Sequence, residues 1–487
     1  MPKADLVLLH APSVYDFRKE SILYGPVSDL VPSTTVFEMY PIGLTTIAEY
    51  LERHGFRVRI VNLALRMLRD PRFDVKKCIR RLNPRAFGID LHWLPHAHGA
   101  LEVARIVKET HPHTPLMFGG FSATYFHEEL IARPEVDYVV RGDSTEEPVL
   151  QLMRHICGHS RGGERPALED IPNLTWKDTT GQAHANPITY VPDSLDHVLI
   201  DYSYVVKAVV RYRDLLGFVP FREWLRYPIT AALTCRGCVH DCQTCGGSAT
   251  AFRRVFNRRQ PAFRSPEALA RDIRNIGRFS RGPVFVLGDI RQAGDEYADR
   301  FLRAIQGYEG PVILELFDPA DRGFIKHLAT AMPNWTLEIS LESHSEEVRA
   351  AFGRRYRNAP IEDTMRYALE AGVKRLDLFF MIGLPRQDYQ SVMDTVTYCD
   401  HLMGDLDGGP EHRLIPFVSP LAPFLDPGSP VFEDPERHGY RFFARTLEEH
   451  RRALLAPSWK RTLNYETRWM SRDQIAEVTY QAALELN

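Results

Sequence analysis

The chain has 487 residues, enough for two or three domains and a large core. Its 60 Lys and Arg residues nearly balance 63 Asp and Glu residues, which argues against a general nucleic-acid binder or a protein of anionic membrane surfaces. The sequence contains no apolar run near the ~18 residues of a membrane span, and its start, MPKADLVLLHAPS, lacks a signal-peptide cleavage site. Four of the seven Cys residues fall between Cys235 and Cys245, which is typical of a reducing compartment and one metal site. We therefore expect a cytoplasmic protein that spans no membrane.

Residues 1–157 alternate between strand and helix patterns. A helical spacing of apolar residues begins at Leu44. Apolar runs typical of buried strands are Leu6–Leu9, Arg57–Val61, Ala86–Ile89, Pro115–Phe118 and Val136–Val140. Five strands with intervening helices predict an α/β domain with a doubly wound, mostly parallel sheet of the Rossmann or flavodoxin-like type. Ligands of such sheets lie beyond the carboxyl ends of the strands.

Three loops at these strand ends contain candidate ligand-binding residues. The candidates are Asp90, His92 and Trp93 after the third strand, Gly119, Gly120, Phe121 and Ser122 after the fourth, and Gly142 after the fifth. Adjacent glycines let the backbone approach a bulky ligand. The alternative is ordinary turn and cap chemistry, since Asp143 or Ser144 would be a good N-cap for the following helix.

The rest of the chain divides into three segments. Residues 158–224 begin with GHSRGGERPALEDIP, rich in Gly, Pro and charge, and are interpreted as a linker. Residues 225–420 contain six strand-like runs with helical patterns between them: Ile229–Leu233, Val284–Leu287, Val312–Leu316, Thr336–Ser340, Arg375–Met381 and Arg413–Phe417. This pattern predicts a partial (β/α)6 TIM barrel, with its chemistry at the carboxyl ends of the strands.

Residues 421–487 have the pattern of a helical C-terminal cap. It contains four polar or aromatic residues that either hold the cap on the barrel, which we prefer, or contact substrate: Tyr465, Glu466, Arg468 and Trp469.

The segment TCRGCVHDCQTC, directly after the first barrel strand, holds Cys238, Cys242 and Cys245 in a C-x3-C-x2-C spacing. Three thiolates this close can ligate an iron–sulfur cube while leaving its fourth iron open to a small molecule. Cys235 allows two alternatives, a four-thiol zinc site or a fully ligated cluster. Three residues between the C-x2-C halves are too few for a zinc ribbon, and a four-thiol cluster would leave no open iron. We interpret Cys235 as a small buried residue at the strand end.

This cysteine motif and its T-x-R-G-C flank resemble the radical S-adenosylmethionine (SAM) superfamily. The resemblance implies that the amino and carboxylate groups of SAM occupy the open iron. Further matches are Gly288 and Asp289 at a Gly-Gly-Glu-like motif that holds the SAM ammonium, Ser340 and Glu342 in a G-x-E-S-like segment near the ribose, and Gly383 in an M-x-G-L-P-like turn near the adenine. Thr244 stands where the family usually has an aromatic residue that packs on adenine. The alternatives are exposed loop carboxylates and a simple turn.

The first domain resembles the cobalamin-binding domain that precedes many radical SAM modules. The match runs from LVLLHAPS through YPIGLTTIAEYLERHGFRV and MFGGFSATYF to VDYVVRGDSTEEPVLQL. It implies that the nucleotide tail of cobalamin threads into the sheet, with the glycine pair lining its slot. The D-x-H-x-x-G motif is missing after the first strand. We therefore expect cobalamin with its own base displaced, and His92 or Trp93 either facing the lower side of cobalt or packing there.

Together the two resemblances imply a class B radical SAM methyltransferase. In that family a reduced 4Fe–4S cluster cleaves SAM, the resulting 5′-deoxyadenosyl radical abstracts hydrogen from an unactivated carbon, and methylcobalamin supplies the methyl group. The implied partners are a peptide, protein or small-molecule substrate and an electron donor such as ferredoxin or flavodoxin. One similar group methylates a glutamine carbon of methyl-coenzyme M reductase. Three alternatives remain: a non-methylating rearrangement or cyclisation, a non-catalytic cobalamin or redox sensor, and a radical SAM enzyme that has lost cobalamin.

Overall fold

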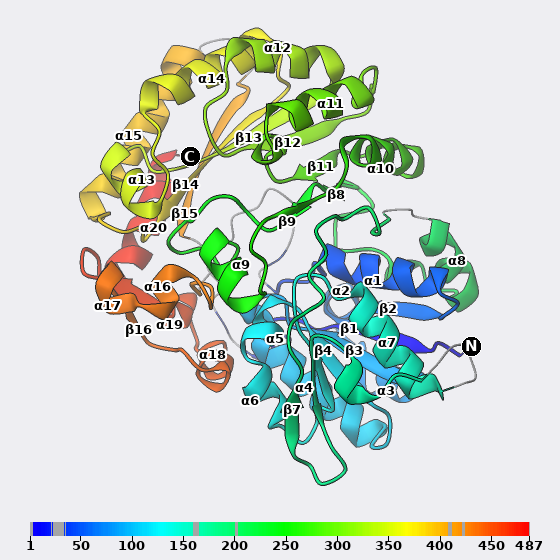
Figure 1. The fold of residues 1–487 in the computed structure, drawn as a ribbon. Coiled ribbons are helices and arrows are strands. Elements are labelled where there is room, and N and C mark those ends of the chain that lie inside the picture. Colours follow the sequence, from blue (N-terminus) through cyan, green and yellow to red (C-terminus); the bar gives the residue numbers. More distant parts are fainter. Residues whose placement is uncertain are drawn as a thin grey trace.

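The computed structural model describes residues 3–20, 22, 34, 36–158, 165–199, 203–407, 412–420 and 424–486. Part of the Gly-rich start of the expected linker, 159–164, and the start of the expected cap, 421–423, lie outside the described residues. The described chain forms two large sheets with their helices, and a smaller C-terminal unit lies beside both (Figure 1). Among the described residues, no helix is both long enough and apolar enough to cross a bilayer.

The first sheet has seven strands in the order β2-β1-β3-β4-β5-β6-β7. Their bounds are β1 Leu6–His10, β2 Val58–Asn62, β3 Ala86–Asp90, β4 Leu116–Gly119, β5 Tyr138–Val140, β6 Leu174–Lys177 and β7 Ala183–Ala185. The first five pair in parallel, while β6 and β7 add antiparallel at one edge. The expected parallel α/β core is confirmed, and the sheet extends into the segment that we expected to be a linker.

Helices cover both faces of this sheet because its strands alternate their side chains. Leu6 and Leu8 pack in one core with α1 and α7, while Val7 and Leu9 pack in another with α3 and α4. The helices of this half are α1 Ile42–Arg53, α2 Leu63–Arg69, α3 Val75–Arg80, α4 Ala97–Thr110, α5 Phe121–Tyr125, α6 His127–Ile131, α7 Glu146–Cys157 and, after β7, α8 Ser203–Tyr212.

The second sheet contains six parallel strands in the order β15-β14-β13-β12-β11-β8. Their bounds are β8 Thr230–Leu233, β11 Val284–Leu287, β12 Val312–Leu316, β13 Trp335–Glu342, β14 Leu376–Ile382 and β15 Leu414–Pro420. A short antiparallel pair, β9 Cys235–Arg236 with β10 Ala262–Phe263, follows β8. The order of six parallel strands agrees with the expected partial barrel.

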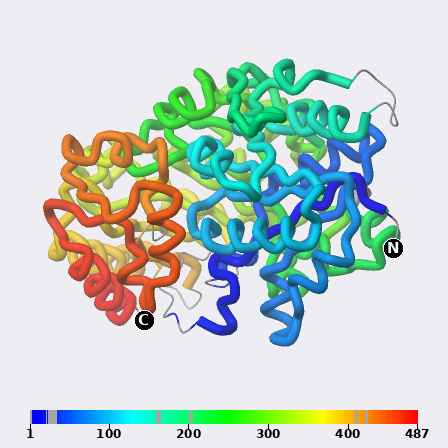
Figure 2. Tube along the Cα trace, turned by 90° about the horizontal axis from the view of Figure 1, so that it is seen from below, coloured from blue at the N-terminus to red at the C-terminus, as the bar shows by residue number. Residues whose placement is uncertain are grey.

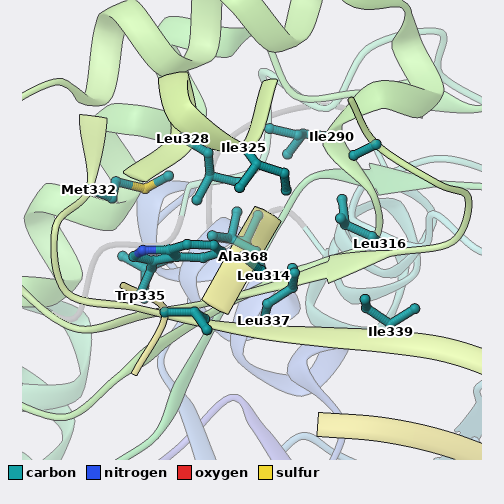
Figure 3. Packing of buried hydrophobic residues seen from close by; sticks show 14 of the residues in the cluster. Ile290, Leu314, Leu316, Ile325, Leu328, Met332, Trp335, Leu337, Ile339 and Ala368 are labelled. Atoms are coloured by element: carbon teal, nitrogen blue, oxygen red, sulfur yellow. The ribbon is translucent and has the colours of Figure 1, made fainter. Parts of the chain in front are cut away.

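The second half has two short helices outside its main core, α9 Ala249–Val255 after the cysteine loop and α13 Glu346–Phe352 beside Cys242 and Leu384. Its other helices pack on one face of the sheet: α10 Pro266–Phe279, α11 Asp295–Ile305, α12 Arg322–Ala331, α14 Asn358–Glu370 and α15 Tyr389–Leu406. In the core beneath them, Leu314 and Leu337 of neighbouring strands lie close to Ile325 and Leu328 of α12 (Figure 3). Fully buried Trp335 closes one end of this core.

The C-terminal unit is helical with one small antiparallel pair. Its elements are α16 Pro430–Glu433, α17 Pro435–His438, β16 Tyr440–Phe442, α18 Leu447–Ala453, α19 Trp459–Thr462, β17 Tyr465–Thr467 and α20 Arg472–Leu486. Fully buried Tyr465 packs against Ile382 and Val392 of the barrel. The unit also lies against the first domain, as Figure 2 shows from below, and Leu447 joins the core of that domain. It is therefore a cap that contacts both halves.

Candidate active site between the two sheets

A cavity of about 970 Å³ lies between the two halves, where the carboxyl ends of strands from both sheets meet. Residues of the first domain that line it include Asp90, His92, Trp93, Gly119, Gly120, Phe121 and Gly142. Residues of the second half that line it include Leu233, Cys235, Arg236, Glu315, Glu338, Ser340, Glu342 and Phe379. Most of the residues expected to bind the first-domain ligand are therefore brought together at one wall.

The two adjacent glycines at the end of β4 have different roles. A side chain on Gly119 would meet only the Val140 carbonyl oxygen, at 3.6 Å, so this position opens onto the cavity. Gly120 has φ +117°, and a Cβ there would lie 2.7 Å from the backbone of Leu91 and His92. Gly120 is therefore required by the close approach of two loops, whereas we expected both glycines to make room for a ligand. Ser122 reinforces this approach by donating its hydroxyl to the His92 carbonyl (3.0 Å), and it does not line the cavity.

Histidine side chains lie near Asp90 at the cavity wall. The ring Nδ1 of His10 lies 3.0 Å from both Asp90 carboxylate oxygens, an interaction that the sequence did not suggest. Burial acts to lower the pKa of His10, but the Asp90 carboxylate raises it overall. Burial lowers the pKa of His92 to about 4, so this imidazole is neutral near pH 7. It packs beside Phe121, with ring centroids 4.6 Å apart, and a role for His92 at cobalt stays a prediction.

The cysteine loop holds its sulfurs in two kinds of environment. The backbone N–H of His240 points at the Cys238 sulfur (3.4 Å), and that of Gly247 points at the Cys245 sulfur (3.2 Å). Donors of this kind suit an anionic, metal-bound sulfur. Cys235 differs, because its thiol donates to the Gly237 carbonyl (3.5 Å). The donor set of the loop therefore fits a cluster held by Cys238, Cys242 and Cys245.

Within the described ranges, no three His, Cys, Asp or Glu side chains are grouped so that they could hold a metal ion. A cube makes a different demand, because each ligating sulfur bonds a different iron. Cys235 lines the cavity, whereas Cys238, Cys242 and Cys245 do not. Cys238 and Cys245 are partly exposed, and Cys242 is buried.

Charged side chains surround the cysteine loop. Burial raises the pKa of the Cys242 thiol overall, and the guanidinium of Arg354, itself 4% exposed, acts in the opposite direction. Glu342 ends β13 with φ +67°, and one of its buried carboxylate oxygens has no hydrogen-bond partner among the described residues. Burial raises the pKa of Glu342 to about 8. Asp426 of the cap reaches the same loop and accepts the Gly246 N–H (3.1 Å).

The structure places the remaining expected SAM residues unevenly. Ser340 and Glu342 line the cavity, while Thr244, Gly288, Asp289 and Gly383 do not. The Asp289 carboxylate accepts hydrogen bonds from the Arg291 guanidinium (2.6 Å) and from the Phe317 N–H (3.0 Å). Its partners are therefore groups of the protein, and this favours a structural role over binding of the SAM ammonium.

A second carboxylate beside Gly288 belongs to Glu315, which accepts the Gly288 N–H (2.6 Å). The sequence analysis did not identify Glu315 as a site residue. A single Glu inside the apolar strand VILEL was the available signal. At Gly383 a Cβ would meet the Tyr465 hydroxyl at 2.5 Å, which favours the structural turn. Thr244 is 2% exposed, with a hydroxyl that lacks a partner among the described residues.

Two buried ion pairs join the two halves next to the cavity. Arg236 of β9 donates to Glu146 at the start of α7 (2.5 and 2.9 Å). Arg258 pairs with Asp143, and both side chains are at most 2% exposed. Burial acts to raise the pKa of Glu146, but Arg236 lowers it to about 2. The sequence indicated either a ligand-binding loop or ordinary turn and cap chemistry at Asp143–Glu146, and it did not indicate a contact between the domains.

Comparison with known families follows the same division of the chain. Residues 29–150 match the model of the B12 binding domain, and residues 233–399 match the model of the radical SAM superfamily. The chain contains a B12 binding domain and a radical SAM domain. The first match covers most of the first sheet, and the second runs from the end of β8 through most of α15.

Two curated proteins are similar to parts of this chain. Cytidylyl-2-hydroxyethylphosphonate methyltransferase of Streptomyces wedmorensis is 25% identical over 191 residues, which are 35% of this chain and 34% of the relative. Hopanoid C-3 methylase of Methylococcus capsulatus (strain ATCC 33009 / NCIMB 11132 / Bath) is 22% identical over 267 residues, 54% of this chain and 45% of the relative. The matched regions thus span less than half the length of these relatives.

Two solved structures share the fold. The radical S-adenosylmethionine methyltransferase TsrM of Kitasatospora setae, with cobalamin and a [4Fe-4S] cluster bound, superimposes with a TM-score of 0.62 at 18% identity, over 91% of this chain and 81% of that chain. The cobalamin-dependent S-adenosylmethionine radical enzyme OxsB superimposes with a TM-score of 0.57 at 11% identity, over 82% of this chain and 52% of that chain. At these identities the likeness is one of fold.

Proposed function

We propose that this protein is a cobalamin-dependent radical SAM methyltransferase that methylates an unactivated carbon of its substrate. The observation that carries the proposal is a cavity to which both domains contribute the carboxyl-end loops of their strands. The cofactors of this enzyme class supply two kinds of chemistry, radical hydrogen abstraction from SAM with a reduced 4Fe–4S cluster and a methyl group from methylcobalamin. Both types of domain needed to bind them are present.

The residues of the chain have separate tasks in this proposal. Cys238, Cys242 and Cys245 would hold the cluster, and the loops around Gly119 would hold cobalamin. Ser340 and Glu342 would contact SAM from the barrel side. The remaining wall is largely apolar, which keeps water from the reacting groups and holds the reactants close together.

The substrate and the electron donor are part of the proposal. TsrM has been solved with a tryptophan substrate, and the curated relatives are named for a phosphonate and a hopanoid. For this chain we propose a peptide, protein or small molecule, including a glutamine of a protein such as methyl-coenzyme M reductase. Ferredoxin or flavodoxin would supply the electrons.

The experiment is anaerobic reconstitution of the full chain with iron, sulfide and hydroxocobalamin, followed by reductant and SAM. 5′-Deoxyadenosine and S-adenosylhomocysteine are measured together, because they report radical formation and methyl transfer respectively. Both products with bound cobalamin support the proposal. 5′-Deoxyadenosine without S-adenosylhomocysteine, in the presence of candidate peptides, favours the non-methylating chemistry. Neither product from protein with an intact cluster favours the sensor.

A further inference from the structure

Two carboxylates on neighbouring barrel strands point into the cavity. Glu315 of β12 and Glu338 of β13 are partners in the parallel register. The residues that flank them along both strands pack in the core under the helices, where Figure 3 shows Leu314, Leu316, Leu337 and Ile339. Because side chains alternate along a strand, Glu315 and Glu338 face the opposite side of the sheet. Both line the cavity there.

Glu338 has no cationic partner among the described residues. It is 3% exposed, and its Oε2 accepts no hydrogen bond. The next acidic residue in the register, Asp377 of β14, is already paired with Arg375 (2.8 Å). Burial, with the neighbouring Glu315 carboxylate, raises the pKa of Glu338 to about 9. Unpaired carboxyl groups in a buried site are costly, so this pair is suited to a cationic partner that arrives from the cavity.

We propose that Glu315 and Glu338 form the receptor for a protonated nitrogen of the substrate, an ammonium or guanidinium group. The same cavity is lined by Trp224, Phe285 and Phe379, whose ring faces attract cations and whose surface fits an apolar body. The substrate class is therefore an amine or guanidine with an apolar or aromatic part. This inference rests on the proposed function only in calling that molecule the substrate.

SAM also carries an ammonium group, but the position of Glu338 favours the substrate. Glu342 marks the carboxyl end of β13, the level of the cysteine loop. Glu338 lies further back along the strand, and the two glutamates pair with Asp377 and Phe380 of β14, three residues apart. This spacing puts Glu338 about 10 Å deeper in the barrel. SAM has to reach the cluster at the rim, so the deeper carboxylate is left to the second reactant.

The test is a binding measurement on the reconstituted full-length protein by anaerobic titration calorimetry. The probes are 2-phenylethylammonium and its neutral counterpart 2-phenylethanol, and the variant is Glu338→Gln. We expect the ammonium probe to bind at least tenfold more weakly to the variant than to the native protein. The alcohol and SAM should bind equally to both. Glu309→Gln, at an exposed site before β12, is the matched control and should bind like the native protein.

Three results would overturn the inference. They are equal binding of the two probes by the native protein, unchanged ammonium binding by Glu338→Gln, and a tenfold loss of SAM affinity in that variant, which would assign the site to SAM. Glu315→Gln is the second variant if the first does not fold, since its amide oxygen can still accept the Gly288 N–H. Selective ammonium binding by protein that forms neither 5′-deoxyadenosine nor S-adenosylhomocysteine would support this inference and contradict the proposed function.

Discussion

At the scale of single residues, the four clustered cysteines differ in what surrounds the sulfur. Cys238 and Cys245 accept backbone N–H groups, as metal-bound thiolates do, while Cys235 donates its own proton. The spacing alone left open a role for Cys235 as a fourth ligand of a cluster or zinc ion, beside the small buried residue that we preferred. The hydrogen bonds favour the three-cysteine interpretation.

Cys238→Ala should abolish both the iron–sulfur cluster and SAM cleavage, because the loop loses one of its three ligands. The measurements are iron and sulfide content, visible absorbance and 5′-deoxyadenosine formation after reconstitution. Cys235→Ala is the control and should keep the cluster. A brown, fully loaded Cys238→Ala protein would remove Cys238 from the ligands.

Gly119→Trp should block cobalamin binding and leave the cluster intact, since the new side chain would project into the cavity. Bound cobalamin and iron are measured on the same sample. Stoichiometric cobalamin in Gly119→Trp would show that the tail lies elsewhere.

Gly120→Ala should instead destabilise the fold. The positive φ of Gly120 and the 2.7 Å distance that a Cβ there would have from the His92 backbone predict a loss of about 1–3 kcal/mol of unfolding free energy.

The residues expected to hold SAM show what a motif can and cannot predict. The sequence correctly located Gly288 and Asp289 after a barrel strand, because an apolar run followed by Gly is a strong local signal. It could not show that Arg291 and the Phe317 N–H donate hydrogen bonds to the Asp289 carboxylate. The Phe317 contact depends on the register between β11 and β12, which the sequence does not reveal. Glu315 and Glu338 were missed for the same reason.

At the scale of elements, buried ion pairs join β9 and the residues after α9 to the loop before α7. Charges placed out of water stabilise a contact only when both partners are present. Replacing one residue of an ion pair should therefore destabilise the contact between the two halves more than replacing both residues.

Arg236→Met should lower the free energy of unfolding by about 3–5 kcal/mol, because Glu146 is left buried without its cation. The double variant Arg236→Met, Glu146→Leu should recover most of this loss. Urea unfolding followed by circular dichroism measures all three proteins. A single variant as stable as the native protein would mean that water replaces Arg236.

Glu146 should also make stability depend on pH in the acid range. Its pKa is about 2 in the folded protein against 4.5 when unfolded, because Arg236 outweighs burial. The folded state therefore gains about 3 kcal/mol that is fully present above pH 4.5 and is lost as the pH falls towards 2. Urea unfolding across this range should show the loss in the native protein and not in Glu146→Gln. Parallel pH profiles would contradict the assignment.

The order of strands and helices was predictable because both halves carry strong apolar periodicity. The antiparallel edge of the first sheet was not. β7 is a three-residue strand with exposed ends, AHA, and no apolar run, so only its pairing with β6 defines it. Two short strands of the segment expected to be a linker, β6 and β7, are therefore part of the sheet.

At the scale of the whole molecule, the cavity belongs to neither half alone. A ligand that fills it should stabilise both halves together. Cobalamin at a hundredfold excess over its Kd should raise the unfolding free energy by about 2.7 kcal/mol, in one transition that moves as a unit. Differential scanning calorimetry measures this. Two transitions, with only one shifted by cobalamin, would show that the first domain binds it without the barrel.

The cap closes the molecule into a ring of three seams. The first domain meets the barrel through Arg236 and Arg258, and the barrel meets the cap through buried Tyr465. The cap returns to the first domain through Leu447 and the Arg133–Glu448 pair (2.7 Å). Because each part contacts the other two, no two parts can rotate away from each other while all three interfaces stay intact. A large cofactor or a protein substrate can therefore enter only when one interface breaks and the parts turn about another.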